Sequence, residues 1–165
     1  MDATTIVVLS SVITLVILLL IVGFPALVSR NWKRHRGETV ERWTAEGITF
    51  IKGPVGGKFM GVESIGSNKN TTGIGFIVLT DLDLRVTRAS PSGEWHIPLQ
   101  QIKGVMLRSK FMDQVSKKTP FIVVRFVADG HKDKLAFQVN DAVAWASELA
   151  QAAGVKLKEP SANDD

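Results

Sequence analysis

Three histidines and two closely spaced aspartates are the side chains of this chain that could perform acid–base or metal chemistry. His35, His96 and His131 lie far apart, and no two of them have the spacing of a zinc-binding motif. Asp81 and Asp83 are two residues apart, which would place them on one face of a strand. Paired carboxylates divide into an acid and a base only in a cleft that separates their pKa values. We therefore expect no active site, no cofactor and no metal site.

A glycine-rich segment, Gly53–Gly57 followed by Lys58, could suggest a phosphate-binding loop. Such a loop needs a glycine, four further residues, and then Gly-Lys-Ser or Gly-Lys-Thr. Counting back places Lys52 at the first glycine position, and Phe59 follows the lysine. The segment is therefore predicted to be a turn. The chain has no cysteine, which excludes thiolate nucleophiles and metal sites built on sulfur.

One group of basic residues could bind a lipid or a protein partner. It consists of Lys103, Arg108, Lys110, Lys117 and Lys118, opposed only by Asp113. Two interpretations stay open. Lysines on an edge strand prevent sheets from joining edge to edge. Alternatively, the patch lies against the anionic inner leaflet of a membrane.

The elements that carry these residues have the period of short strands. Apolar and polar residues alternate, or apolar residues run together, in segments bounded by Gly, Pro, Asn and Asp. The predicted strands are Phe59–Ile65, Ile74–Thr80, Leu82–Thr87, Trp95–Leu99, Ile102–Phe111, Phe121–Val127 and Leu135–Val139. Asp129-Gly130 predicts a hairpin turn between the last two. The fold class is therefore mainly β.

The period then changes to that of a helix. Asn140 is the predicted N-cap and Gly154 the predicted C-terminal end. One face carries apolar residues at helical spacing, namely Ala142, Trp145, Ala146, Leu149 and Ala153. We expect Trp145 and Leu149 to pack into the core, and the polar residues 155–165 to form a disordered tail.

The amino-terminal segment, residues 1–29, is predicted to be a transmembrane helix. Its apolar core, Ile6–Val28, has 23 residues. Such a helix is about 34 Å long, and a bilayer's hydrocarbon core is about 30 Å thick. A cleaved signal peptide is the alternative, but Met1-Asp2 carries no basic residue and Gly23–Ala26 offers no good cleavage site.

Charge predicts the orientation of this helix. Arg30, Lys33, Arg34 and Arg36 follow it directly, together with Trp32 as an interfacial anchor, whereas only Asp2 precedes it. The positive-inside rule places the amino terminus outside and residues 30–165 in the cytoplasm. Residues 37–165 hold 16 Lys and Arg against 15 Asp and Glu. The net charge of +4 thus reflects topology, and we expect no nucleic acid partner.

Two segments resemble a known family. Gly75–Leu84 (GFIVLTDLDL) is similar to the G-x-L-x-L-T-x-x-x-L stretch of GRAM and bacterial PH-like domains, and Trp95–Ile102 (WHIPLQQI) to their I-P-L-x-x-I step. The chain as a whole resembles actinobacterial-type single-pass membrane proteins that carry such a domain. The resemblance implies a seven-stranded PH-like barrel or sandwich at 59–154, capped by the carboxyl-terminal helix and joined to the membrane by residues 30–58.

The family's phosphoinositide-binding members use basic residues in the loop between their first two strands. The corresponding segment here, Gly66–Gly73, contains only Lys69. We therefore expect a membrane-anchored, non-enzymatic interaction or scaffold module that contacts the bilayer and a membrane or cytoplasmic protein. An accessory subunit of a transporter or export system, and a domain that senses anionic lipid, are the alternatives.

Overall fold

The computed structural model describes residues 37–66, 72–89 and 92–158. The chain divides into two compact units, residues 1–42 and residues 43–165. Residues 37–45 are helical, and the second unit begins within this helix, at Trp43. The predicted transmembrane segment and the cluster Arg30, Trp32, Lys33, Arg34 and Arg36 lie outside the described residues. Within those residues, no helix has the length and apolar character needed to cross a membrane.

The second unit is built on one large sheet, with strand order β10-β5-β8-β9-β1-β2-β3-β4. Neighbouring strands are antiparallel, except for β10 beside β5. The strands are β1 (Phe50–Val62), β2 (Gly73–Thr80), β3 (Asp83–Ala89), β4 (Ser92–Pro98), β5 (Ile102–Arg108), β8 (Phe121–Ala128), β9 (His131–Gln138) and β10 (Leu157–Lys158). The shorter elements are η1 (Glu63–Ile65), η2 (Leu99–Gln101), and the hairpin of β6 (Lys110–Phe111) and β7 (Gln114–Val115).

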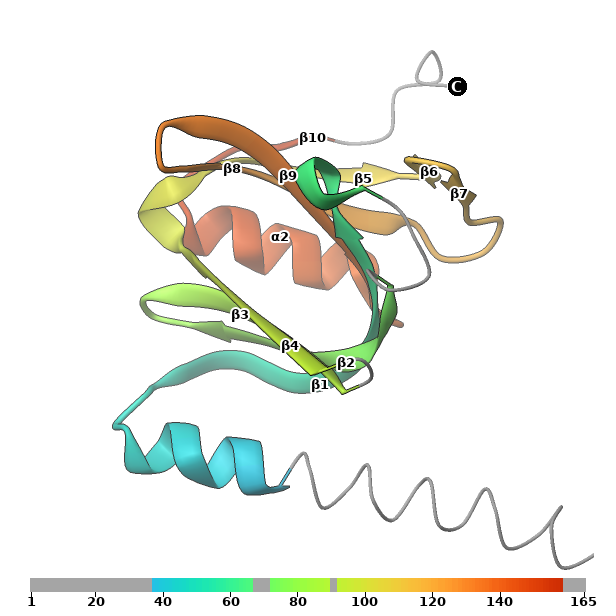
Figure 1. Cartoon of the computed structure of the whole chain (residues 1–165). Coiled ribbons are helices and arrows are strands. Elements are labelled where there is room, and N and C mark those ends of the chain that lie inside the picture. Colours follow the sequence, from blue (N-terminus) through green and yellow to red (C-terminus); the bar gives the residue numbers. More distant parts are fainter. Residues whose placement is uncertain (1–36, 67–71, 90–91, 159–165) are drawn as a thin grey trace, which may run out of the picture. The chain divides into compact units, whose positions relative to one another are not determined.

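The sheet folds over itself into two layers, and the helix α2 (Ala142–Ala152) lies at the open side between them (Figure 1). The strand β1 belongs to both layers, because it pairs with β2 over Phe50–Phe59 and with β9 over Lys58–Val62. A register shift falls between Phe59 and Gly61, and Gly61 has a φ of 114°. This bulge at a left-handed glycine bends the strand from one layer into the other.

The turn predicted at Gly53–Gly57 is wrong, because this segment is part of β1. A register shift between Lys52 and Val55 interrupts the pairing with β2 without ending the strand. A Cβ atom at Gly57 would lie 2.4 Å from Ile77 Cδ1 and 2.7 Å from the Gln138 carbonyl oxygen. Glycine is thus needed here because the neighbouring strands approach closely, and not because the chain turns.

The core lies between the two layers. Phe59, Ile77, Leu84, Val124 and Phe137 are fully buried there. The ring of Phe59 stacks on Trp95, with 4.2 Å between the ring centroids. Leu82, predicted to alternate inward with Leu84 and Val86, is 67% exposed, because residues 81–82 form a bend and β3 begins only at Asp83.

The helix α2 closes the core as predicted. Trp145 and Leu149 are buried, and Trp145 meets Phe137 edge to face at a centroid distance of 6.5 Å. The helix begins at Ala142 with Asp141 as the N-cap residue, one position after the predicted Asn140. Gly154 ends it with a φ of 64°, and its amide donates to the Gln151 carbonyl.

The strand count differs from the prediction of seven. The described residues contain ten strands, and the three additional ones, β6, β7 and β10, have two residues each. The predicted strand Ile102–Phe111 breaks after Arg108, and β6 then pairs with β7 instead of β8. Leu157 and Lys158, predicted to lie in a disordered tail, pair with Val105 and Met106 of β5.

Candidate ligand-binding groove

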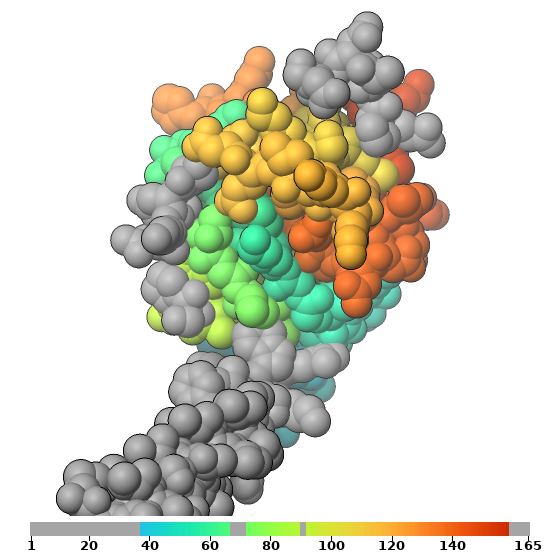
Figure 2. Space-filling view, turned by 90° about the vertical axis from the view of Figure 1, so that its right-hand side faces the viewer, coloured from blue at the N-terminus to red at the C-terminus, as the bar shows by residue number. Residues whose placement is uncertain are grey.

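The layer of β5, β8 and β9 has apolar residues on both of its faces. Val124 and Phe126 of β8 face the main core, whereas Phe121 and Val123 join a second cluster on the outer face. This outer cluster also contains Met60 of β1 and Phe111 of β6. The short β6–β7 hairpin, part of the amber segment in Figure 2, therefore packs against the outer face of the sheet.

Next to this cluster, the outer face forms a groove lined mainly by basic residues. It consists of two adjoining cavities of about 440 and 380 Å³, which share Glu63, Arg125 and Lys134. The charged residues that line them are six basic, Lys103, Arg108, Lys110, Arg125, Lys132 and Lys134, and two acidic, Glu63 and Asp133. We call this feature the outer groove.

Strand register fixes the floor of the outer groove. Gly104, Arg125 and Lys134 stand in one row across β5, β8 and β9. Met106, Val123 and Ala136 form the next row, and Arg108 is paired with Phe121 in the third. Along the strands, the floor therefore changes from basic to apolar and back to basic, with Lys110 lining the groove at the end near Arg108.

Arg125 extends across its neighbouring strand. A Cβ atom at Gly104 would lie 2.9 Å from Arg125 Nη2 and 3.1 Å from Arg125 Nε, so the guanidinium occupies the space that this glycine leaves open. Arg125 Nε is buried and donates no hydrogen bond within the described part of the chain. Arg125 also takes part in none of the ion pairs formed there.

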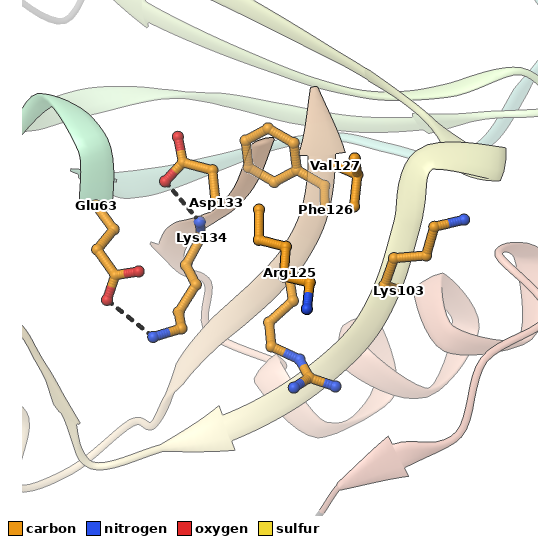
Figure 3. A pocket seen from close by; sticks show the side chains of 8 residues that line it. Glu63, Lys103, Arg125, Phe126, Val127, Asp133 and Lys134 are labelled. Carbon is orange, nitrogen blue, oxygen red and sulfur yellow. Dashed lines mark hydrogen bonds and ion pairs between the residues drawn. The ribbon is translucent and has the colours of Figure 1, made fainter. Parts of the chain in front are cut away.

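Lys134, directly opposite Arg125, has an acidic partner. Its Nζ donates to Glu63 Oε1 at 2.8 Å, and Figure 3 shows the two side chains meeting at the edge of the groove. Asp133 accepts hydrogen bonds from the Ser64 amide and hydroxyl, which tie η1 to β9. Like charges directly opposite each other on paired strands are destabilising. Glu63 offsets the charge of Lys134, while that of Arg125 is left unbalanced.

The structure brings three members of the predicted basic patch to the outer groove. Lys103 lines one cavity, and Arg108 and Lys110 line the other. The Lys103 ammonium donates to the Gln100 carbonyl at 2.9 Å and points away from Arg125 (Figure 3). Lys117 and Lys118 are exposed in the loop between β7 and β8 and line neither cavity.

Sequence reasoning missed the other basic residues of the groove, namely Arg125, Lys132 and Lys134. Arg125 does carry a signal, because it is the single charged residue of β8. A charge within a strand that is apolar on both faces must point to an opening or to a partner. The significance of Gly104 depends on its register with Arg125, which the sequence does not give.

The other residues with possible chemistry have structural roles. Asp83 is buried and accepts from Arg85 Nε at 2.9 Å and from the Thr80 hydroxyl at 2.6 Å, whereas Asp81 lies exposed in a bend. They therefore do not share a strand face as predicted. His96 bonds to Glu94 at 2.7 Å on the edge strand β4.

His131 is exposed at the start of β9, after a turn in which Asp129 and Gly130 both have positive φ, as the predicted hairpin requires. His35 lies outside the described residues. Among the residues that are described, no group of three or more His, Asp or Glu side chains could hold a metal ion.

Comparison with known proteins adds no relative. No protein-family model matches the chain, and no curated protein is significantly similar to it.

Proposed function

We propose that this chain is a non-enzymatic interaction module, held by one amino-terminal helix at the cytoplasmic face of a membrane, and that the outer groove is its binding face. The module is proposed to be a PH-like domain. Support comes from the bent strand β1, which is shared by two layers, and from the helix α2, which closes them. The membrane anchor rests on the apolar run Ile6–Val28 and the basic residues after it.

The outer groove is the observation that carries the proposal. Its floor lies on three long strands of one sheet, so its side chains are held on a rigid support. Six basic residues line it against two acidic ones, although residues 37–165 are nearly neutral as a whole. A charge of one sign concentrated in a concavity attracts a ligand of the opposite sign.

An anionic lipid is the second candidate ligand. Lys103, Lys110 and Lys132 are exposed basic residues at this face. A basic residue near an anionic bilayer contributes about 1 kcal/mol to membrane association. Attraction of this kind falls when salt screens the charges. Against a flat membrane, however, Glu63 and Asp133 would oppose the lipid phosphates.

Proximity labelling from the carboxyl terminus of the full chain in cells tests the proposed function. The groove variant carries Arg125→Gln and Lys110→Gln, and the matched control carries Lys117→Gln and Lys118→Gln. Both variants lose two positive charges, but only the first loses them from the groove. We expect the wild-type and control chains to label the same cytoplasmic or membrane proteins, and the groove variant to lose a reproducible subset. Identical sets from all three chains would reject the groove as the binding face.

A further inference from the structure

The outer groove has a pattern that selects among anionic ligands, because its charges are divided. Arg125 lies at one end and Arg108 with Lys110 at the other, and the apolar row of Met106 and Val123 lies between them. The row of Arg125 and the row of Arg108 are four residues apart along β5. At about 3.4 Å per residue of antiparallel strand, they are separated by about 13 Å.

We propose that the outer groove binds an extended acidic segment of a partner protein, with the pattern acidic-x-apolar-x-acidic. In an extended chain, alternate side chains point to the same side and the backbone advances about 3.3 Å per residue. Residues i, i+2 and i+4 of such a segment therefore have the spacing of the three rows of the floor. The first acid faces Arg125, the apolar residue faces Met106 and Val123, and the second acid faces Arg108 and Lys110.

Arg125 is the anchor for the first acid. Its guanidinium has no acidic partner within the described residues, and it stands directly opposite the positive charge of Lys134. A carboxylate bound there would balance a charge that the fold leaves unbalanced, through charge-assisted hydrogen bonds to the planar fork of the guanidinium. Gly104 keeps that fork in place, because any larger residue would displace it.

The groove fits a peptide better than a lipid headgroup. A headgroup presents one compact cluster of negative charge, whereas the two basic ends of this groove have an apolar floor between them. The acidic residues Glu63 and Asp133 line the groove beside Lys134. They limit how much negative charge can accumulate at that wall, which favours separate carboxylates over phosphates.

The test uses the full chain in nanodiscs of neutral phosphatidylcholine and a labelled peptide, Gly-Asp-Ser-Leu-Ser-Asp-Gly, with blocked ends. Binding is measured by fluorescence anisotropy. A peptide with Lys in place of both Asp controls for charge, and Gly-Asp-Asp-Leu-Ser-Ser-Gly keeps the composition while it changes the spacing. We expect the first peptide to bind, the lysine peptide not to bind, and the respaced peptide to bind at least ~5-fold more weakly, because it reaches one basic end only.

Three variants separate charge from geometry. Arg125→Gln should weaken binding at least ~10-fold, the effect of losing a hydrogen bond between charged groups. Gly104→Ala changes no charge but displaces the guanidinium, so it should also weaken binding. Lys118→Gln removes one positive charge outside the groove and should change the affinity less than ~2-fold. Arg125→Gln also removes a like-charge pair from the sheet, so its thermal unfolding temperature should not fall.

Several results would overturn the inference. These are equal affinity of the wild-type and Arg125→Gln chains, equal binding of the respaced peptide, or Arg125-dependent binding to phosphatidylserine nanodiscs without peptide binding, which would assign the groove to lipid. If deletion of residues 159–165 alone created peptide binding, the chain's own acidic end would be the preferred occupant. The inference rests on the proposed function only for the choice of the groove. Its peptide assay is blind to membrane orientation, so the two can fail separately.

Discussion

At the scale of single residues, glycines and one buried ion pair decide how closely the strands pack. A Cβ atom at Gly75 would lie 1.7 Å from the Thr87 carbonyl oxygen on the paired strand β3. Asp83 and Arg85 are less than 10% exposed, and the Arg85 guanidinium also stacks on Trp43 at 5.4 Å. Both features sit on the β2–β3 side of the sheet, away from the outer groove. Changing them should therefore test the fold without touching the binding face.

Gly75→Ala should destabilise the domain strongly, because the new methyl group collides with backbone and not with a side chain that can move away. Overpacking of this kind costs about 1–3 kcal/mol, and we expect the upper end of that range. Gly56→Ala is the matched control, since nothing lies within 4 Å of its Cβ position. Urea unfolding of the full chain measures both variants. Comparable midpoints for the two would contradict the strand packing described above.

Asp83→Asn should destabilise the domain by about 3 kcal/mol, because it leaves the buried Arg85 without its carboxylate. Asp81→Asn removes the same charge from the exposed bend two residues earlier and should change the free energy of unfolding by less than about 0.5 kcal/mol. Urea unfolding again gives the comparison. An equal effect of the two substitutions would mean that Asp83 is not the partner that holds Arg85.

At the scale of elements, residues 43–49 are fastened to the sheet by few contacts. Trp43 is buried, and its ring lies 6.4 Å from that of Phe50. The Ile48 amide donates to the Trp43 carbonyl, and the Asp81 amide donates to the Thr49 carbonyl. A segment with a single large buried anchor should detach locally before the sheet unfolds.

Trp43→Ala should therefore loosen residues 44–49 selectively. Hydrogen exchange of the Ile48 amide is expected to accelerate by at least tenfold, whereas the amides of β8 keep most of their protection. Loss of a buried tryptophan side chain costs about 3–5 kcal/mol, enough to open a peripheral segment. Trp43→Phe retains an aromatic ring and should have a smaller effect. If β8 lost as much protection as Ile48, the segment would be an integral part of the core.

The sequence predicted the long elements well and the short ones poorly. The strands β2, β4, β8 and β9 and the helix α2 follow clear periods, and their predicted positions are close to the observed ones. The start of β1 was missed because Gly53, Pro54, Gly56 and Gly57 have the composition of a turn. Their strand conformation depends on contacts with β2 and β9, which are distant in sequence. The hairpin β6–β7 was missed because two-residue strands have no period.

The candidate site was predicted only where its residues are close in sequence. Lys103, Arg108 and Lys110 lie within eight positions, and all three line the outer groove. Lys134 and Arg125 join them through the register of β8 with β9 and with β5. Side chains that meet across a sheet leave no local pattern, so this half of the groove could not be found from composition or spacing.

At the scale of the whole molecule, the proposal depends on which side of the membrane the domain occupies. The segment 30–36 carries four basic residues, and residues 37–165 are nearly neutral. A cytoplasmic domain can meet cytoplasmic partners and the inner leaflet, and an external domain can meet neither. Every ligand proposed for the outer groove therefore assumes the orientation derived from Arg30, Lys33, Arg34 and Arg36.

Labelling of a single cysteine tests this claim most directly, because the chain has no cysteine of its own. Lys118→Cys places one thiol in the exposed loop before β8, outside the outer groove. Intact cells and lysed cells are treated with a maleimide that cannot cross membranes, and the modified fraction of the full chain is measured. We predict modification only after lysis. Modification of Lys118→Cys in intact cells would contradict a cytoplasmic interaction module.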